Sequence, residues 1–415
     1  MKVLLSAIAC HPQWGSEAHV GWQAMLNIAQ THEVWVLTHC SARPGIEEAI
    51  NQKKVPSHVR FHYLGNPGPC HPNRMIARLG SWWEFHQWNQ AALELGRKLQ
   101  RENHFDLVHH VTYATWRMPS PLWRLDAPFI WGPVGGVASF PWRFFPILST
   151  QAKGLEAARN IANLINAKSH ELEQCLKNSA AIIASNQESY DFFAKIRGNT
   201  QGLHLLSAAS FSEEKIAALN NFTAEDKSGD VLRLFAGGNM IGSKGVGLAL
   251  RVLAELKARG IKFHYTVGGR GPETGYLEKL SARLGLSGHV HFDDGIRGQA
   301  YLDTLKKSHV FFMPSFRENA PVTILEAMLA GCVPCVVDAS AQGEIVRKCG
   351  LGFAAPIKSI QECEEALCDY LLSCKWDTEN WSEKGRACST FVSQQYGESK
   401  YRDYIQQLYR QFRKA

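Results

Sequence analysis

Two glutamates, Glu318 and Glu326, lie in the C-terminal third of the chain with seven residues between them. Pro321 lies between them, and the fixed backbone angle φ of proline favours the first position of a helix. An apolar stripe with helical spacing begins at Leu325. We therefore predict a helix whose amino end lies between the two carboxylates. A helix amino end offers unpaired N–H groups and partial positive charge to a phosphate, and carboxylates accept hydrogen bonds from sugar hydroxyls. This combination suits a nucleotide sugar.

A lysine in a glycine-rich segment provides a second group for binding phosphate. The strand-like run 232–236 ends in Gly237 and Gly238, and Lys244 follows at the predicted start of the next helix. Its ammonium group and the helix N–H groups can share one pyrophosphate. A lysine in a loop is more often a solvated surface residue, but the flanking glycines favour the binding role.

Four stretches in this order resemble the family 4 retaining glycosyltransferases, which have the GT-B fold. They are residues 236–246, 265–272, 314–334 and 342–346, and the match extends roughly over residues 231–356. The resemblance implies two Rossmann-like doubly wound α/β domains facing a cleft, with a C-terminal helix that crosses back to the first domain. It implies retaining transfer of a sugar from a nucleoside-diphosphate sugar. We expect the acceptor to be a cell-surface polysaccharide or lipid-linked glycan intermediate. No metal ion or other cofactor is expected.

The resemblance also assigns roles to individual residues. Lys244 is expected to hold the donor diphosphate, Glu326 to accept the ribose hydroxyls, and Glu318 to lie beside the transferred sugar and its phosphate. The remaining expected donor-binding residues are Gly15, Ser16, Gly238, Asn239, Gly269, Arg270, Ala320, Pro321 and Val322.

Two departures from the family pattern concern charge and proton transfer. Asn239 stands where the family commonly has an arginine, and the missing cation could come from Arg233, Arg270 or Arg317. The segment 131–136 lacks the histidine that many relatives have there, so His109 and His110 are alternative catalytic candidates. Histidines in a strand are more often structural. In the retaining reaction the departing phosphate oxygen can itself take the acceptor proton, so the missing histidine matters less.

The composition fits two globular domains, because the chain has 415 residues, of which 45% are hydrophobic and 20% charged. Short apolar runs alternate with amphipathic stretches, which predicts parallel sheets covered by helices. The predicted strands are 3–8, 34–38, 105–111, 129–131, 181–184 and 203–206, followed by 232–236, 263–267, 290–292, 310–313 and 333–337. We predict an acceptor-side domain at 1–210, a nucleotide-sugar-binding domain at 211–395, and a helix at 396–415 that packs on the first domain.

The expected location is the cytoplasm, with peripheral contact to an anionic membrane face. The first strand begins at Val3, which leaves no room for a signal peptide, and no apolar run is long enough for a membrane span. The formal net charge is +7, and the loop Phe140–Pro146 combines aromatic rings with Arg143. The basic helix at 74–101 has an apolar stripe that could serve the same contact, although such a stripe is usually core. Nucleic acid is not an expected partner, because the basic residues are dispersed.

Two other motifs are interpreted as structural. Cys332 and Cys335 form a lone C-x-x-C without the second pair that zinc or redox sites need, and Asp293-Asp294 indicates a turn. Two alternatives to sugar transfer remain open at the level of sequence. One is a GT-B sugar-nucleotide epimerase, against which the glutamate pair argues. The other is a catalytically silent nucleotide-sugar-binding homologue, which Asn239 and the absent histidine favour.

Overall fold

The computed structural model describes residues 1–14, 17–65, 74–113, 115–374 and 378–413. The chain forms two compact units. Unit 1 comprises Met1–Val137, Ile165–Ala208 and Tyr401–Ala415, and unit 2 comprises Ala138–Leu164 and Ala209–Lys400.

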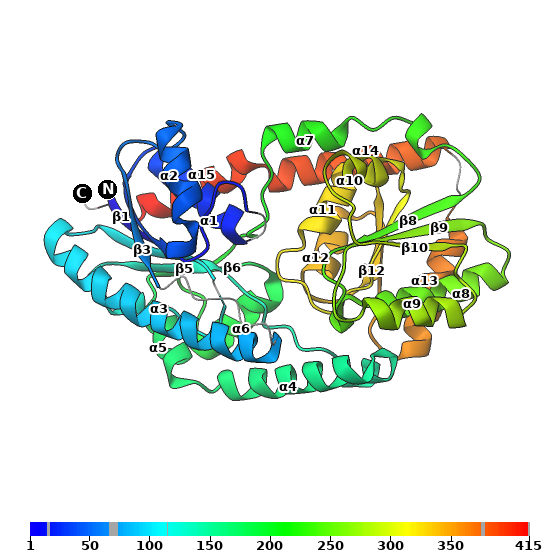
Figure 1. Cartoon of the computed structure of the whole chain (residues 1–415), viewed down its shortest axis with the longest axis horizontal. Helices are drawn as coiled ribbons and strands as arrows, with labels where there is room; N and C mark the ends of the chain where they lie inside the picture. The colour runs from blue at the N-terminus through cyan, green and yellow to red at the C-terminus, as the bar shows by residue number, and fades with distance from the viewer. Residues whose placement is uncertain (15–16, 66–73, 114, 375–377, 414–415) are drawn as a thin grey trace. The chain divides into compact units, whose positions relative to one another are not determined.

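Unit 1 is built on a parallel sheet of seven strands in the order β3-β2-β1-β4-β5-β6-β7. Its strands are β1 (Lys2–Ala7), β2 (Glu33–His39), β3 (Val59–Leu64), β4 (Leu107–Thr112), β5 (Phe129–Val134), β6 (Ala181–Ala184) and β7 (Leu203–Leu205). The accompanying helices are α1 (Glu17–Ala29), α2 (Arg43–Asn51), α3 (Arg74–Asn103), α5 (His170–Asn178) and α6 (Gln187–Arg197), and α15 (Glu398–Arg410) at the end of the chain (Figure 1).

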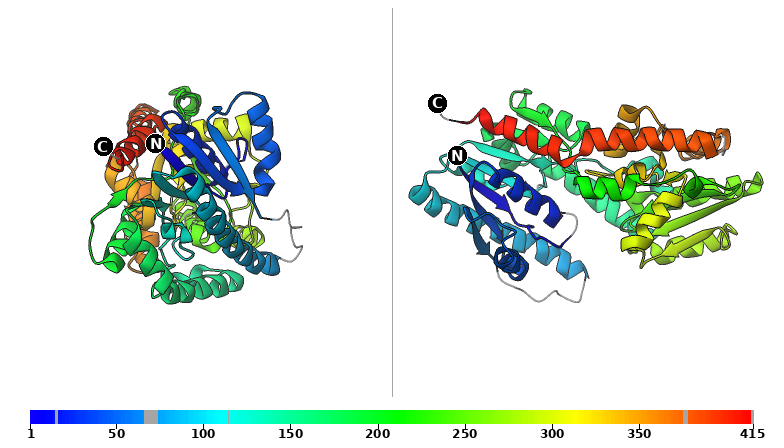
Figure 2. Two further views of the ribbon diagram at one scale, coloured as in Figure 1. Left: turned by 90° about the vertical axis from the view of Figure 1, so that its left-hand side faces the viewer. Right: turned by 90° about the horizontal axis from the view of Figure 1, so that it is seen from above.

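Two helices complete the core of unit 1. In α3, the described residues Phe85, Trp88 and Ala92 are buried against strands of the sheet. This stripe is therefore core in the described part of α3, and its use as a membrane contact is not supported there. The predicted C-terminal helix is confirmed, because Tyr401 and Ile405 of α15 are buried with residues of β1 and α1; Figure 2 shows α15 in red from two directions.

Unit 2 is built on a parallel sheet of six strands in the order β10-β9-β8-β11-β12-β13. Its strands are β8 (Leu232–Gly237), β9 (Phe263–Gly268), β10 (Val290–Asp293), β11 (Val310–Phe312), β12 (Val333–Val337) and β13 (Phe353–Ala355). Its helices are α4 (Thr150–Asn166), which ends in unit 1, α7 (Glu213–Asn220), α8 (Val246–Ala258), α9 (Thr274–Arg283), α10 (Gly298–Lys307), α11 (Val322–Leu329), α12 (Ser340–Cys349), α13 (Ile360–Ser373) and α14 (Thr378–Tyr396) (Figure 1).

The eleven strands predicted from apolar runs are all present, with ends that agree or differ by at most three residues. The two strands that the sequence does not predict, β3 and β13, are edge strands. In β3 apolar residues alternate with Arg60 and His62, and β13 has only three residues. An edge strand is covered on fewer sides than a central one, so it needs no long apolar run.

The segment 138–164 belongs to unit 2, whereas the sequence predicts one domain over 1–210. The reason is a buried aromatic contact. Phe140 and Phe144 are buried in the core of unit 2, and their rings lie 4.9 Å and 4.7 Å from the ring of Phe316. A membrane contact through these two rings is therefore wrong, and of the four aromatic residues of the loop Trp142 alone is classed as exposed, at 57%.

Candidate functional site

The expected donor-binding residues of unit 2 gather at the carboxyl edge of its sheet. Strands β8, β9 and β11 are parallel, so the loops that follow them emerge at the same edge. A pocket of about 420 Å³ opens there. It is lined by Gly237, Gly238, Asn239, Gly268, Gly269, Arg270, Asp294, Ile296, Arg297, Tyr301 and Thr323. Four predicted donor-binding residues, Gly238, Asn239, Gly269 and Arg270, thus share one cavity with side chains from α10 and α11.

Glycine is required where these loops approach one another. Gly269 has φ +116°, and a Cβ built on it would lie 2.2 Å from the carbonyl oxygen of Gly238. Gly245 has φ +69°, and its Cβ would lie 2.0 Å from the carbonyl oxygen of Pro314. Both positions combine left-handed backbone with close packing, so a side chain at either would displace the loop. These contacts hold the loops after β8, β9 and β11 together.

Lys244 and Glu318 form an ion pair beside this pocket. Lys244 lies in the short 3-10 turn Gly242–Lys244 just before α8, and Glu318 lies in the loop before α11. Lys244 Nζ is 2.5 Å from Glu318 Oε1, and the two side chains are 17% and 10% exposed. A Cβ on Gly238 would lie 3.9 Å from Lys244 Nζ, so the ammonium group faces the loop after β8. The structure thus brings together Gly238, Lys244 and Glu318.

The backbone of Glu318 is fixed from a second side. Its N–H donates to Ser340 Oγ at 2.8 Å, and its carbonyl accepts from the N–H of Ala341 at 3.3 Å. Ser340 adopts φ +41°, an unfavourable value for a residue with a side chain. The strained residue lies at the amino end of α12, where its hydroxyl oxygen accepts the hydrogen bond from Glu318.

Glu326 lies in α11, four residues after Val322, and it has two partners from other helices. Tyr301 of α10 donates to Glu326 Oε2 at 2.6 Å, and Lys215 Nζ of α7 is 3.1 Å from Glu326 Oε1. Burial, together with the adjacent carboxylate, raises the pKa of Tyr301 well above its usual range, so this phenol stays protonated and donates. The helix begins between the two glutamates, as predicted, with Pro321 as the residue preceding its first turn.

The sequence does not predict the roles of Tyr301, Lys215 and Arg297. Tyr301 and Arg297 follow β10 in a segment without a recognisable pattern, and Lys215 lies in α7, before the first predicted strand of the second domain. Each reaches the site only through the tertiary fold. No sequence spacing relates them to Glu326 or to the glycine-rich loop.

The three arginines proposed as the missing cation have different surroundings. Arg270 lines the pocket and is paired with Asp294 at 2.7 Å. Arg233 donates to backbone carbonyls at the amino end of β8, including that of Asp226 at 2.9 Å. Arg317 forms a largely buried ion pair with Glu156 of α4. Of the three, Arg270 lies where it can face a ligand in this pocket.

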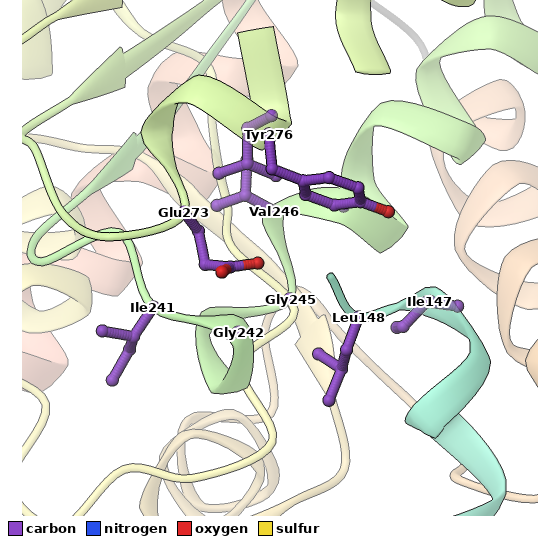
Figure 3. Close-up of a pocket in the computed structure, with 10 residues that line it drawn as sticks. Ile147, Leu148, Ile241, Gly242, Gly245, Val246, Glu273 and Tyr276 are labelled. Atoms are coloured by element: carbon purple, nitrogen blue, oxygen red, sulfur yellow. The ribbon is translucent and has the colours of Figure 1, made fainter. Parts of the chain in front are cut away.

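A smaller pocket lies on the other side of the Lys244 turn. It has a volume of about 10 Å³ and is lined by Ile147, Leu148, Ile241, Gly242, Gly245, Val246, Gly247, Glu273, Tyr276 and Leu277. Figure 3 shows the Glu273 carboxylate directed between Gly242 and Leu148, and Ser149 Oγ donates to this carboxylate at 2.6 Å. A volume of one water is too small for a nucleotide. This pocket therefore belongs to the packing that supports the Lys244 turn.

His109 and His110 are core residues of β4. The ring of His109 contacts Tyr409 Oη through Nδ1 at 2.6 Å and the carbonyl oxygen of Gly132 through Nε2 at 2.8 Å. His110 Nδ1 lies 2.9 Å from Ser6 Oγ. Burial lowers the pKa of each histidine to about 4. Exposures of 1% and 0% leave neither ring accessible to a substrate, so the structure does not support a direct catalytic role.

The remaining predictions have simple outcomes. Cys332 and Cys335 are buried free thiols, and Asp293 Oδ1 accepts from the N–H of Gly295 in a turn, as the structural interpretation expects. Gly15 and Ser16 lie outside the described residues. Within the described part of the chain, no helix combines the length and the apolar character needed to cross a membrane.

One family model and several known proteins are similar to this chain. Residues 220–387 match the family model described as glycosyl transferases group 1, and this range contains Lys244, Glu318 and Glu326. EpsF of Bacillus subtilis, a protein named as a glycosyltransferase, is 32% identical over 102 residues. That alignment covers 25% of this chain and only 26% of EpsF, about a quarter of its length.

Solved structures show the fold over nearly the whole chain. Sucrose-phosphate synthase from Thermosynechococcus elongatus gives a TM-score of 0.66 at 15% identity, over 99% of this chain and 98% of the other. HepE of Anabaena, solved with UDP-glucose, gives a TM-score of 0.61 at 14% identity, over 99% of this chain and 100% of HepE. WaaG, a glycosyltransferase of lipopolysaccharide biosynthesis, gives a TM-score of 0.58 at 15% identity, over 98% of this chain and 99% of WaaG. The two parallel sheets with their helices are therefore those of the GT-B fold.

Proposed function

We propose that this chain is a retaining glycosyltransferase that uses a nucleoside-diphosphate sugar. The observation that carries the proposal is the Lys244–Glu318 pair, held next to the glycine-lined pocket of unit 2. A diphosphate carries negative charge that an ammonium group and nearby guanidinium groups can balance. The match of residues 220–387 to the group 1 glycosyltransferases supports the same class of activity.

The donor would occupy the 420 Å³ pocket with its diphosphate toward Lys244. Arg270 and Arg297 line the pocket and would replace the cation that Asn239 does not provide. Glu326 would accept the ribose hydroxyls, oriented for this by the hydrogen bond from Tyr301. HepE, which has the same fold, was solved with UDP-glucose, and this supports a nucleotide sugar as the class of ligand.

In the proposed reaction the acceptor hydroxyl oxygen bonds to the anomeric carbon on the face from which the diphosphate leaves. The bond between that carbon and the diphosphate oxygen breaks, and the acceptor proton passes to the departing phosphate oxygen. Lys244 stabilises the charge that develops on the diphosphate, an effect of about 3 kcal/mol for a well-placed donor. No protein histidine is needed for this proton transfer.

The proposed acceptor is a cell-surface polysaccharide or lipid-linked glycan intermediate, taken up at the cytoplasmic face of a membrane. The similarity in fold to WaaG, a protein of lipopolysaccharide biosynthesis, supports this choice.

The donor assignment can be tested by thermal unfolding with a panel of nucleotide sugars. A ligand at about 100 times its dissociation constant stabilises the folded state by about 2.7 kcal/mol, which raises the melting temperature measurably. We expect one nucleotide class to stabilise the wild type and to stabilise Glu326→Ala much less. If no nucleotide sugar shifts the melting temperature, the donor assignment is wrong.

Retention is tested separately, by proton NMR of the anomeric signal in the first product formed. We expect the configuration of the donor to be kept. An inverted product would remove the proposed same-face attack, and turnover of the donor without any acceptor would favour the epimerase.

A further inference from the structure

Helix α4 has its polar side buried and its apolar side exposed. The buried residues of α4 are Ala152, Glu156, Asn160 and Asn163. The exposed large apolar residues are Leu155, Ile161, Leu164 and Ile165, with exposures of 42%, 52%, 68% and 67%. A surface helix normally shows the opposite distribution. We call these four exposed residues the outer stripe.

The buried polar side explains why α4 keeps this orientation. Glu156 forms its ion pair with Arg317, the residue next to Glu318. Asn160 accepts from the N–H of Phe140 at 3.0 Å and donates to the carbonyl oxygen of Phe140 at 2.7 Å. Rotating the helix to bury the outer stripe would break these contacts and leave a carboxylate unpaired. The exposure of the stripe is therefore built into the fold.

The outer stripe is continuous along the helix. Ile161 and Ile165 lie one turn apart on one side of α4, and the exposed small residues Gly154 and Ala158 continue the same side toward the amino end, with Leu155 as one border. Leu164 borders it and is the most exposed of the four. Contiguous exposed apolar surface of this kind marks an interaction surface.

The charge around the stripe indicates what covers it. The segment 138–168 contains four cationic side chains, Arg143, Lys153, Arg159 and Lys168, and a single acidic residue, Glu156. Glu156 is buried and paired, so it does not offset the cations at the surface. Trp142, in the same segment, is also strongly exposed. Arg143 donates to the carbonyl oxygen of Lys358, and the Nε of Arg159 is buried, so Lys153 and Lys168 are the cations considered for contact with lipid. An apolar stripe with these two lysines in the same segment fits the interface of an anionic membrane.

We propose that the outer stripe of α4 inserts into the interfacial region of an anionic lipid bilayer, with the surrounding cations bound to lipid phosphates. A symmetric contact between two copies is disfavoured, because it would place this cationic surface against itself without acidic partners. The inference extends the proposed transfer to a lipid-linked acceptor, but it concerns binding alone. It assigns the membrane contact to the exposed outer stripe, because Phe140 and Phe144 are buried.

The test is flotation of the purified full chain with vesicles, without donor or acceptor. One set is pure phosphatidylcholine and the other contains phosphatidylglycerol. We expect the wild type to bind the anionic vesicles at least about tenfold better. The triple variant Ile161→Ser, Leu164→Ser, Ile165→Ser should weaken that binding by at least about tenfold. Its fold should persist, because the three side chains are exposed.

Matched controls separate the stripe from general surface effects. Ile50→Ser on α2 removes an exposed isoleucine elsewhere and should leave binding unchanged, in contrast to Ile165→Ser alone. For charge, Lys153→Glu with Lys168→Glu should abolish binding to anionic vesicles. Lys54→Glu with Lys98→Glu changes the net charge equally at other exposed sites and should have little effect.

Each outcome decides the proposal. Equal binding to both vesicle types, or equal loss with both charge pairs, would overturn it, as would a triple variant that still floats. A wild type that dimerises through the stripe and ignores vesicles would assign the surface to a second copy. Donor-induced stabilisation, measured without vesicles, tests the transferase assignment independently, so either proposal can fail while the other stands.

Discussion

The carboxyl ends of the two parallel sheets differ in the polar groups that they carry. In unit 2, Lys244 and Glu318 form a partly accessible ion pair beside a pocket. In unit 1, His109 and His110 are buried in β4 with structural partners. Doubly wound folds place ligands outside the carboxyl ends of their strands, so both sets of residues are reasonable candidates from sequence. Accessibility separates them.

The difference shows how burial determines what a polar side chain can do. Removing an isolated charge from water is expensive, so the buried histidines are held neutral and their pKa values fall to about 4. Lys244 and Glu318 form an ion pair instead, and they retain some access to solvent. A ligand diphosphate can therefore compete for Lys244, whereas it has no path to the rings of β4. The following predictions test this contrast, from the largest expected effect to the smallest.

Replacing Lys244 by alanine should have the largest effect. The change removes the positive charge expected at the departing diphosphate, and we expect turnover to fall by at least about 100-fold. Initial rates with a saturating donor measure this. Lys262→Ala, at an exposed lysine paired with Asp230, serves as the control and should have the wild-type rate. A folded Lys244→Ala enzyme with wild-type turnover would show that the diphosphate lies elsewhere.

Glu318→Gln should lower turnover by about tenfold while changing donor affinity by less than about threefold. The amide keeps the size of the side chain but removes the carboxylate beside Lys244, which the proposed donor placement puts next to the transferred sugar. Separate measurements of donor binding and of single-turnover rates distinguish the two effects. An equal loss in both would instead place Glu318 in uniform donor binding.

The pair Tyr301 and Glu326 should govern donor affinity. We expect Glu326→Ala to weaken binding by at least about tenfold, through loss of a charged acceptor for ribose hydroxyls. Tyr301→Phe removes only the hydrogen bond that orients this carboxylate, so a loss of about fivefold is expected. Calorimetric titration with the donor measures both. If Tyr301→Phe weakened binding more than Glu326→Ala, the phenol itself would be the ligand-binding group.

The central strands and the Lys244–Glu318 site were predictable because each leaves a local signal. A buried parallel strand is an apolar run, and the glycine-rich loop and paired glutamates have fixed spacing. Strand β3 has no such run because it lies at an edge. Lys215 contacts Glu326 only through the packing of α7 near α11, which no local pattern encodes. The assignment of 138–164 to unit 2 depends in the same way on Phe140 and Phe144 meeting Phe316.

Substitutions at the histidines of β4 should affect stability much more than catalysis. His110→Asn should keep turnover at pH 7.5 within about threefold of the wild type, since the ring does not reach solvent. It should lower the free energy of unfolding by about 1–3 kcal/mol, because the contact with Ser6 is disturbed. Urea unfolding measures the second quantity. Lost turnover with unchanged stability would return His110 to the catalytic candidates.

The same histidines predict the direction of the pH dependence. Their pKa values are lowered from 6.5 to about 4 in the folded state, so the unfolded chain binds protons that the folded chain does not. The contribution of these histidines to the free energy of unfolding is therefore fully present above pH 6.5, and it is lost as the pH falls toward 4. Each histidine contributes at most about 1.4 kcal/mol per pH unit in this range. His110→Asn should reduce the slope by one such contribution, and an unchanged slope would contradict the burial argument.

Exhaustive chelation should have the smallest effect. The pocket of unit 2 places Arg270 and Arg297 near the Lys244 turn, so protein cations are available for the donor diphosphate. Asp294, an acidic residue at the pocket, is already paired with Arg270 at 2.7 Å. A Lewis acid at this position would have to compete with these groups. We therefore expect turnover in EDTA to stay within about twofold of the untreated rate.

Complete loss, restored by magnesium or manganese, would show that Lys244 and the arginines do not neutralise the leaving group on their own. In that case Asp294, released from Arg270, would be the first carboxylate to replace when searching for the metal ligand.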